Sequence, residues 1–576
     1  MLKLLRYFKI NYILLTSLFL IIALRTVGTL YLPTLTADII NNGVIKGDVS
    51  YVIKTGGMML FIAALTGILA IISVYLTANF SSIFSRNIRR KIFSQAQRLS
   101  VQDFKHFSTA SLITRCTSDV NHIENAIALF FKMIIPVPFI TVIGMFLAFS
   151  KDPYMALLIL VTALIFLVFT MLISKKIIIL SIRMQTELDR INSKVRQFIS
   201  GIRVIRAFNR ENHEKEKMDD TFTSYSDINI KINKIYALAM PFVMIVLDGC
   251  TVAVLWFGAI RINNGYLLIG DIMAVVEYAI LILVYFVMAI MVLIDLPRAI
   301  ACSKRILEVL EYQPEIIDKE NTKVIPNMKN DLEFRNVTFS YQDAKEPILK
   351  SLNFACERGK TTAIIGATGS GKSTISKLIP RLHQIQGGEI ILNGVNIKDF
   401  TQTDLRDKIS YCPQKAFLFS GTIAENIRHG KRNATIEEIK NAAIAAQADA
   451  FIMGLSAHYD AQVSQGGSNF SGGQKQRLCI ARALVKKSDI YIFDDSFSAL
   501  DYKTDVLLRK AIKIEVKNAI VITIAQRISS ILDADQIVVL EEGKIAGVGN
   551  HKELLKNCSV YQQIVESQLS KEELEC

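Results

Sequence analysis

Long apolar stretches dominate the pattern of hydrophobic and polar positions in the first half of the chain. Six of them are about 20 residues long, which is the length that an α-helix needs to cross the hydrocarbon core of a bilayer. These stretches predict transmembrane helices at 12–32, 55–79, 127–149, 154–174, 236–259 and 272–294. Residues 1–300 are therefore expected to form a transmembrane domain in the lipid bilayer.

Basic side chains gather on one side of these predicted spans. Those that follow the second and the fourth span are Arg86, Arg89, Arg90, Lys91, Arg98, Lys175, Lys176, Arg183, Arg190, Lys194 and Arg196. The loops on the other side carry mainly Lys46, Lys151 and Arg261. Because cytosolic loops carry an excess of Lys and Arg, we expect the N-terminus in the cytosol. The pattern predicts a multi-pass protein of the plasma membrane, and we expect a bacterial one.

Two cytosolic connections are long, at 80–126 and 175–235, and their apolar residues keep a helical spacing. The membrane helices are therefore expected to continue into the cytosol. Turning points are predicted at 103–108 and 201–208, where exposed apolar tips would suit docking on another domain. An ordinary helical-hairpin turn is the alternative interpretation of both tips.

Ionisable residues interrupt the apolar spans. They are Arg25, Lys132, Asp248, Glu277 and, near the end of a span, Asp295. Charge at bilayer depth is expensive and usually faces the protein interior or a wet cavity. The sequence leaves two hypotheses open, a polar translocation pathway and ion pairs between helices.

Composition agrees with a membrane protein more than with a nucleic-acid binder. The 576 residues are 51% hydrophobic, and the net charge of +14 comes largely from basic residues beside the spans. We therefore expect no nucleic-acid partner. The eight cysteines show no metal-binding spacing, and reduced thiols are expected in the cytosol.

The second half of the chain has the composition of a soluble domain. Residues 301–329 are expected to be a linker, and residues 330–576 an α/β domain that opens with the alternating pattern of a half-buried strand at 332–339. The predicted fold is thus an α-helical membrane domain of six transmembrane helices, with long cytosolic extensions, fused to an α/β P-loop nucleotide-binding domain.

A glycine-rich loop between an apolar strand and a helix start predicts a phosphate site. Its residues, with the first helical position after it, are Gly366, Ala367, Thr368, Gly369, Ser370, Gly371, Lys372, Ser373 and Thr374. The glycines let backbone N–H groups surround phosphate oxygens at the positive end of a helix. Lys372 would reach the terminal phosphates, and the Ser373 hydroxyl would bind Mg²⁺. The chain is predicted to bind a nucleoside triphosphate.

Two further motifs surround this loop. The apolar run 489–494 ends in Asp494, which would bind Mg²⁺ from the side opposite to Ser373. A second phosphate cradle opens a helix and consists of Ser471, Gly472, Gly473 and Gln474. Since one nucleotide does not need two cradles, we expect two such domains to pair head to tail, each completing the other's site.

This set of motifs resembles the ATP-binding cassette (ABC) transporters over essentially the whole chain, and in particular the half-transporters of the exporter branch. The resemblance implies ATP and Mg²⁺ as cofactors and an ATPase coupled to transport. By the same resemblance Tyr341 stacks on adenine, Gln414 belongs to the Q-loop that senses Mg²⁺, and Asp501 belongs to the D-loop. The tips at 103–108 and 201–208 would be coupling helices, the first of them docking on the partner's cassette.

Three positions depart from the pattern of the family. Asp495 stands where the family has its catalytic Glu, and Gln526 stands where it has its switch His. Gln465 replaces an acidic residue before the signature, which is the family's name for the motif at 470–474 that contains the second cradle. Asp is shorter than Glu by one methylene, ~1.5 Å, and Gln cannot relay a proton as imidazole can. The candidate catalytic residues at the reacting phosphate are thus Asp495, Gln526 and Lys372. Two changes at one site indicate a degenerate site, and the alternative is a slowed site in which Asp495 still serves as base.

The resemblance implies a non-identical half-transporter as partner, with the consensus Glu and His, and a multidrug-type exporter of small amphipathic drugs, lipids or peptides. A slow homodimeric exporter and an ATP-binding regulatory or channel-like membrane protein are the competing hypotheses. A soluble DNA-repair ATPase shares these motifs, but the membrane spans exclude it.

Overall fold

The computed structural model describes residues 2–5, 7, 12–319, 331–341 and 344–568, and it divides into two compact units. The membrane unit comprises Met1–Arg98 and Phe107–Gln313, and the cassette unit comprises Leu99–His106 and Pro314–Cys576. Within the predicted linker 301–329, the first residues are helical as far as Glu311, and 320–329 lie outside the described residues.

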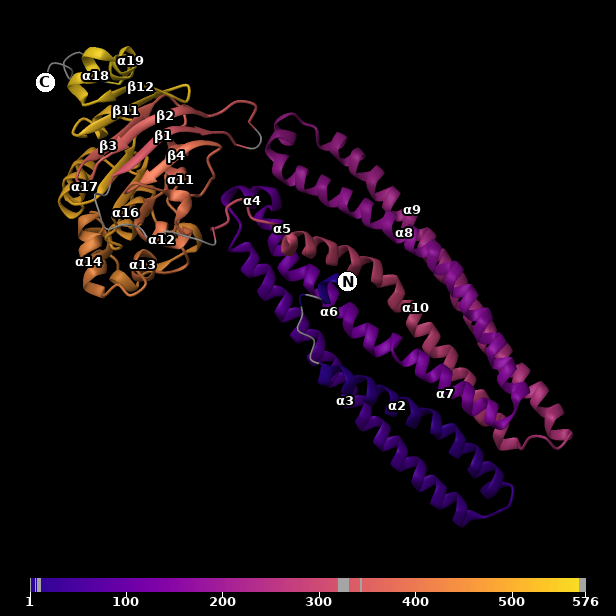
Figure 1. Ribbon diagram of the computed structural model, residues 1–576. Coiled ribbons are helices and arrows are strands. Elements are labelled where there is room, and N and C mark those ends of the chain that lie inside the picture. The colour runs from indigo at the N-terminus through magenta and orange to yellow at the C-terminus, as the bar shows by residue number, and fades with distance from the viewer. Residues whose placement is uncertain (1, 6, 8–11, 320–330, 342–343, 569–576) are drawn as a thin grey trace. The chain divides into compact units, whose positions relative to one another are not determined.

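The membrane unit is built from long helices (Figure 1). They are α1 (Leu2–Leu5), α2 (Tyr12–Asp38), α3 (Val49–Ala96), α5 (Thr109–Thr114), α6 (Val120–Leu129), α7 (Pro136–Lys151), α8 (Pro153–Ala207), α9 (Glu211–Asn263) and α10 (Ile269–Glu311), with π-helical turns η1 (Ile39–Val44), η2 (Arg115–Asp119) and η3 (Phe130–Ile134). Within the described residues, six helical segments are long and apolar enough to cross a membrane. Between 11% and 39% of the apolar window of each is buried within this chain, so most of that surface is left for lipid or a second subunit.

The helices continue beyond the predicted spans. Helices α8 and α9 contain 55 and 53 residues and lie side by side along their length (Figure 1). The turn between them falls at 208–210, at the end of the stretch 201–208 where we expect it, because Gly201 lies inside α8 and does not end it. Phe208 in this turn is 73% exposed, as an apolar tip requires.

The cassette unit contains two main sheets. The strands are β1 (Leu332–Phe339), β2 (Leu349–Cys356), β3 (Thr361–Gly366), β4 (Gly387–Leu392), β5 (Val395–Asn396), β6 (Ile409–Cys412), β7 (Gly421–Thr422), β8 (Gln462–Val463), β9 (Ile490–Asp494), β10 (Ile520–Ile524), β11 (Gln536–Glu541) and β12 (Lys544–Gly549). One sheet has the order β2-β1-β4-β5, and the larger has the order β12-β11-β3-β10-β9-β6. In the larger sheet β11, β3, β10, β9 and β6 run parallel, so their carboxyl ends meet at one edge. Ligands bind at this edge in open α/β sheets.

Helices complete the cassette unit. They are α4 (Val101–Phe107), α11 (Lys372–Leu378), α12 (Gln402–Asp407), α13 (Ile423–Arg428), α14 (Ile436–Ala445), α15 (Asp449–Met453), α16 (Gly472–Leu484), α17 (Tyr502–Glu515), α18 (His551–Asn557) and α19 (Ser559–Glu566). The parallel strands are buried on both faces, and Ile364, Ile492 and Ile522 are fully enclosed. The prediction of six membrane-spanning helices fused to an α/β P-loop domain is confirmed.

The first cytosolic tip belongs to the cassette of its own chain in this structure. The buried Asp103 carboxylate accepts hydrogen bonds from the backbone N–H groups of Ser100 (2.7 Å) and Glu315 (3.3 Å). Lys105 Nζ lies 5.2 Å from the ring centroid of Tyr341. Docking of this tip on the partner's cassette stays a prediction, and within this chain the Asp103 carboxylate fixes the tip to Glu315, which follows α10.

Candidate functional site

The glycine-rich loop connects β3 to α11, as the sequence predicts. Gly369 and Gly371 have φ of +87° and +97°, in the left-handed region that favours glycine. A Cβ at Gly366 would lie 2.2 Å from the backbone oxygen of Leu540, so only glycine fits between β3 and β11. Ala367, Thr368 and Gly369 form the exposed tip of the loop. The result is an open backbone cradle in front of a helix N-terminus.

Two polar side chains of this loop, Lys372 and Ser370, are available to bind a ligand. Lys372 Nζ donates to the carbonyl oxygens of Gly366 (2.7 Å) and Ala367 (2.9 Å). Burial lowers the pKa of Lys372, and the charges of Asp495 and Asp494 oppose this effect. The Ser370 hydroxyl is buried and has no hydrogen-bond partner among the described residues. The Lys372 ammonium, which contacts only carbonyls of its own loop, and the unpaired Ser370 hydroxyl could both donate hydrogen bonds to a bound phosphate.

The carboxylate of Asp494 lies at the carboxyl end of β9, next to the start of α11. It is 1% exposed and accepts hydrogen bonds from Ser373 Oγ (2.8 Å) and Ser376 Oγ (2.9 Å). The Tyr411 hydroxyl donates to the same carboxylate at 3.3 Å, and burial raises the pKa of Tyr411 to about 12. A hydroxyl and a carboxylate in contact beside a phosphate loop suit Mg²⁺, which prefers oxygen ligands. Among the described residues, no cluster of His, Cys, Asp and Glu side chains suits any other metal.

Asp495, Gln526 and Gln414 meet at one atom. Gln526 Nε2 donates to Asp495 Oδ2 at 2.9 Å, and Gln414 Nε2 donates to the same oxygen at 3.0 Å. Burial raises the pKa of the Asp495 carboxyl, and the hydrogen bonds from Gln414 and Ser498 act in the opposite direction. The Asp495 backbone has φ of +48°, an uncommon conformation that Asp tolerates better than most residues. Two of the three residues that depart from the family pattern, Asp495 and Gln526, are thus direct hydrogen-bond partners.

The second cradle begins helix α16. Ser471 is its N-cap, and a capping box joins Ser471 to Gln474, with Ser471 N donating to Gln474 Oε1 at 2.9 Å. A Cβ at Gly472 would meet no atom within 4 Å, whereas one at Gly473 would lie 3.2 Å from the Ala499 backbone oxygen. The N-terminus of this 13-residue helix is therefore open on the side of Gly472. Its exposed N–H groups can receive a phosphate of another molecule.

The remaining predicted site residues surround these two cradles. The Tyr341 hydroxyl lies 3.4 Å from Thr374 Oγ1, which places its ring beside the start of α11. Asp501 is the N-cap of α17, and a hydrogen bond from the Thr504 backbone N–H lowers its pKa. Gln465 is exposed in a short helical turn before the signature.

The structure adds residues that sequence reasoning missed. Ser376 lies three positions after Ser373 on α11, so helical spacing could have indicated that both reach Asp494. Gln568 bridges the loop that carries Gln526, because it donates to the Gln526 carbonyl (2.8 Å) and accepts from Ile528 N–H (2.8 Å). No local signal links Gln568 to that loop, since 42 residues separate Gln568 from Gln526.

The charged residues of the spans have different surroundings. Arg25 and Lys132 line one cavity of the membrane unit. Asp248 and Glu277 are exposed in this chain, and neither forms an ion pair with any residue that the structure describes. The side chain of Asp295 lies outside the described part of the chain.

Known proteins match the chain over almost its whole length. The ABC transporter transmembrane region matches residues 14–286, and the ABC transporter domain matches residues 349–498. An uncharacterized ABC transporter ATP-binding protein of Mycobacterium tuberculosis is 36% identical over 94% of each chain. An ATP-dependent lipid A-core flippase of Desulfotalea psychrophila is 33% identical over 84% of each chain. A solved bacterial Atm1-family ABC exporter with ATP bound has a TM-score of 0.84 at 23% identity, over 98% of this chain and 99% of the other.

The chain belongs to the ABC transporter family. With one membrane domain and one cassette, it is a half-transporter of the exporter type, which works with a second half-transporter, identical or not. It is a multi-pass membrane protein with a cytosolic ATP-binding domain, and its cassette is an ATPase domain coupled to transport.

Proposed function

We propose that the chain is the degenerate-site subunit of a heterodimeric ABC exporter, and that its own site binds MgATP but hydrolyses it slowly. The observation that carries this proposal is the pair of hydrogen bonds from Gln526 and Gln414 to Asp495 Oδ2. A general base must accept a proton from the attacking water. Two amide donors already engage the oxygen that would accept it, and Gln526 cannot ionise to assist.

The length of the Asp495 side chain should also slow hydrolysis at this site. Asp495 carries its carboxylate ~1.5 Å less far from the backbone than Glu would. A misplacement of ~1 Å can lower a rate by ~10²-fold. The site therefore retains the groups that bind nucleotide and lacks a well-positioned base.

Nucleotide binding at this site rests on two side chains of the glycine-rich loop and one at the end of β9. Lys372 would bind the terminal phosphates, while Ser373 and Asp494 would bind Mg²⁺, as their 2.8 Å contact suggests. When bound, Mg²⁺ neutralises charge that develops on the phosphates. The chain's own contribution is to hold ATP in the closed assembly, and hydrolysis at the partner's site would drive the transport cycle.

The signature at Ser471 and Gly472 supports a role for this chain in the partner's site. Its capping box is complete and its first N–H groups are open, so it can complete a site that contains the consensus Glu and His. We therefore propose a non-identical partner that carries the consensus catalytic Glu and switch His. Drugs, lipids and peptides of amphipathic character remain the proposed cargo, and the lipid A-core flippases among the relatives favour a lipid.

Two substitutions in the assembled pair test this proposal. Gly472→Asp adds a carboxylate where the structure has free space, so the cassette should fold normally. Facing the partner's γ-phosphate at ~4 Å, that carboxylate would add ~1 kcal/mol of repulsion in water and several in a partly dry site. Gly472→Asp should abolish ATP hydrolysis and transport, whereas Asp495→Asn should leave most of both.

Gly472→Ala is the matched control, because it fills the same space without charge and should keep most activity. Phosphate release and vesicle uptake are measured for all variants side by side. Equal losses from Gly472→Asp and Asp495→Asn would mean two equivalent sites, as in a slow homodimeric exporter, and would reject the asymmetric proposal.

A further inference from the structure

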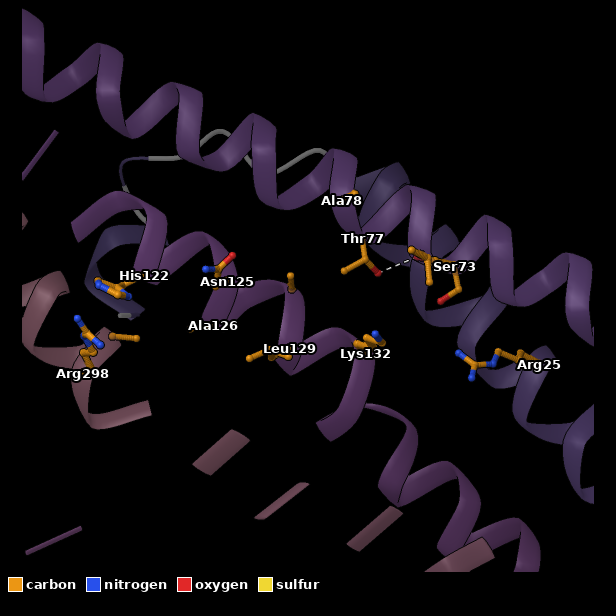
Figure 2. A pocket seen from close by; sticks show the side chains of 13 residues that line it. Arg25, Ser73, Thr77, Ala78, His122, Asn125, Ala126, Leu129, Lys132 and Arg298 are labelled. Atoms are coloured by element: carbon orange, nitrogen blue, oxygen red, sulfur yellow. Dashed lines mark hydrogen bonds between the residues drawn. The ribbon is translucent and has the colours of Figure 1, made fainter. Parts of the chain in front are cut away.

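A cavity of about 540 Å³ lies in the membrane unit, between α2, α3, α6, η3 and α10 (Figure 2). Its volume is within the range of small-molecule sites. Three basic side chains line it, Arg25 from α2, Lys132 from η3 and Arg298 from α10. They come from three segments far apart in sequence, so the fold brings them to one space.

No carboxylate is among the described residues that line this cavity. Arg25, Lys132 and Arg298 also form no ion pair with any part of the chain that the structure describes. Three of the acidic side chains on neighbouring segments have cationic partners of their own. These pairs are Asp119 with Arg305 (2.6 Å), Glu124 with Arg89 (3.8 Å) and Glu308 with Arg115 (3.1 Å).

The rest of the lining combines polar donors with apolar surface. Thr77 Oγ1 donates to the Ser73 carbonyl at 2.8 Å, and the amide of Asn125 lies on the opposite side, on α6 (Figure 2). Val74 and Leu129 supply apolar walls. A ligand with one charged end and one apolar body matches this division better than a fully polar or a fully apolar ligand.

The cavity lies toward the cytosolic ends of the predicted spans. Lys132 is a few residues inside the span 127–149, and Arg298 follows the span 272–294, so both lie within ~10 Å of the predicted boundary at 1.5 Å per helical residue. Arg25 is near the middle of the span 12–32. The three cations therefore extend from the level of the inner-leaflet headgroups toward the hydrocarbon core.

Three like charges that share one space near the bilayer repel each other and are expensive without counter-charge. An anion relieves that repulsion, and arginine can bind a phosphate or carboxylate through two parallel hydrogen bonds. We propose that this cavity binds the anionic head of an amphipathic molecule, a phosphate or carboxylate joined to an apolar body. The identity of this ligand as transported cargo rests on the export function proposed above, whereas its binding does not.

The first test compares headgroups on the unmodified full-length chain, in phosphatidylcholine nanodiscs and in the assembly in which it purifies. The probes are short-chain phosphatidic acid and phosphatidylcholine with the same fluorescent acyl chain. Phosphatidic acid should bind at least about tenfold more tightly, and added salt should weaken its binding because two of the cations are exposed. Equal affinities of the two lipids would overturn the proposal.

The second test removes the charges. Each of Arg25→Gln, Lys132→Gln and Arg298→Gln should weaken phosphatidic acid binding about threefold, and the triple variant about thirtyfold. Lys132→Arg should retain binding. The control Arg90→Gln removes an exposed cation ~20 Å further along α3 than Thr77 and should change nothing.

Nucleotide binding by the cassette shows whether each variant is folded. If the triple variant does not fold, the headgroup comparison on the unmodified chain still tests the proposal. Wild-type affinity in a folded triple variant would overturn the proposal.

A third measurement separates the two sources of such an anion. If anilinonaphthalene sulfonate displaces the labelled phosphatidic acid at similar concentrations, the natural ligand is a soluble organic anion. If it displaces the lipid only weakly, the natural ligand is a membrane lipid. Both outcomes support an anion site. ATP-driven translocation of phosphatidic acid in proteoliposomes then tests export separately. Binding that depends on the three cations without ATP-driven movement would retain the site and reject export of this cargo, whereas movement unaffected by the triple variant would reject the site.

Discussion

The side-chain amide of Gln526 donates a hydrogen bond of 2.9 Å to Asp495 Oδ2. These residues follow the neighbouring parallel strands β10 and β9, in which Ile524 pairs with Asp494. Their contact joins two of the three departures from the family pattern. A substitution at either position alone can break this hydrogen bond, so the two should be changed together.

Restoring both consensus residues should activate the chain's own site. The Asp495→Glu, Gln526→His variant should hydrolyse ATP at least ~10-fold faster at this site, because the carboxylate moves ~1.5 Å outward and an ionisable ring replaces the amide. The measurement is phosphate release in a Gly472→Asp background, in which the partner's site is silent. Lys372→Ala in the same background is the control and should remove the gain. No increase would mean that side-chain identity at these positions does not limit the rate.

Gln568 should stabilise the loop that carries Gln526. Gln568→Ala removes the acceptor of the Ile528 N–H, so amide exchange at Ile528 should become about fivefold faster, as expected for ~1 kcal/mol per hydrogen bond. Hydrogen exchange read out by mass spectrometry checks this. Gln562→Ala, which removes a side-chain contact to Leu555 nearby, is the control. Unchanged exchange in Gln568→Ala would show that the loop is held by other contacts.

The ion pair between Arg305 and Asp119 should respond unequally to the loss of its two members. Arg305 is 46% exposed, whereas Asp119 is 2% exposed. Arg305→Ala leaves a buried carboxylate without its cation and should lower the free energy of unfolding by about 2 to 3 kcal/mol. Asp119→Ala leaves an arginine that can reach water and should lower it by about 1 kcal/mol. Thermal unfolding in detergent compares the two, and a larger loss from Asp119→Ala would contradict this account.

The cassette should become less stable in mild acid through His383. Burial, with a smaller contribution from the charges of Lys377 and Lys105, lowers the pKa of this imidazole from 6.5 to about 4. Because the unfolded chain binds this proton more readily, the free energy of unfolding should fall as pH decreases from 6.5 to about 4, by a few kcal/mol at most.

His383→Phe keeps the ring contacts with Phe339 and Tyr341 and should flatten this pH dependence. Chemical denaturation at several pH values measures it. The exposed His429, replaced by Phe in the same way, is the control. A slope in the His383→Phe variant equal to that of the wild type would assign the acid sensitivity to other groups.

Local patterns were sufficient to predict the spans and the glycine-rich loop, because hydropathy over ~20 residues and glycine spacing are properties of contiguous sequence. They placed the second cytosolic turn within 201–208, and the turn falls at the end of that stretch, at 208–210, with Gly201 inside α8. Glycine lowers helix stability by only ~1 kcal/mol per residue, and the packing of α8 along α9 exceeds that. The contacts of Gln568 with Gln526 and of Asp103 with Glu315 join distant residues, so no local pattern could predict them.

The end of α10 is followed by a very short connection. Helix α10 ends at Glu311, and Asp318 already accepts hydrogen bonds from Gln402 N–H at 3.2 Å and lies 3.6 Å from Arg381. Residues 312–317 can span at most ~20 Å when fully extended. So short a connection limits how far the start of the cassette can move away from the end of α10. Flexible residues inserted at this point should therefore uncouple the two activities, so that ATP hydrolysis continues and transport stops.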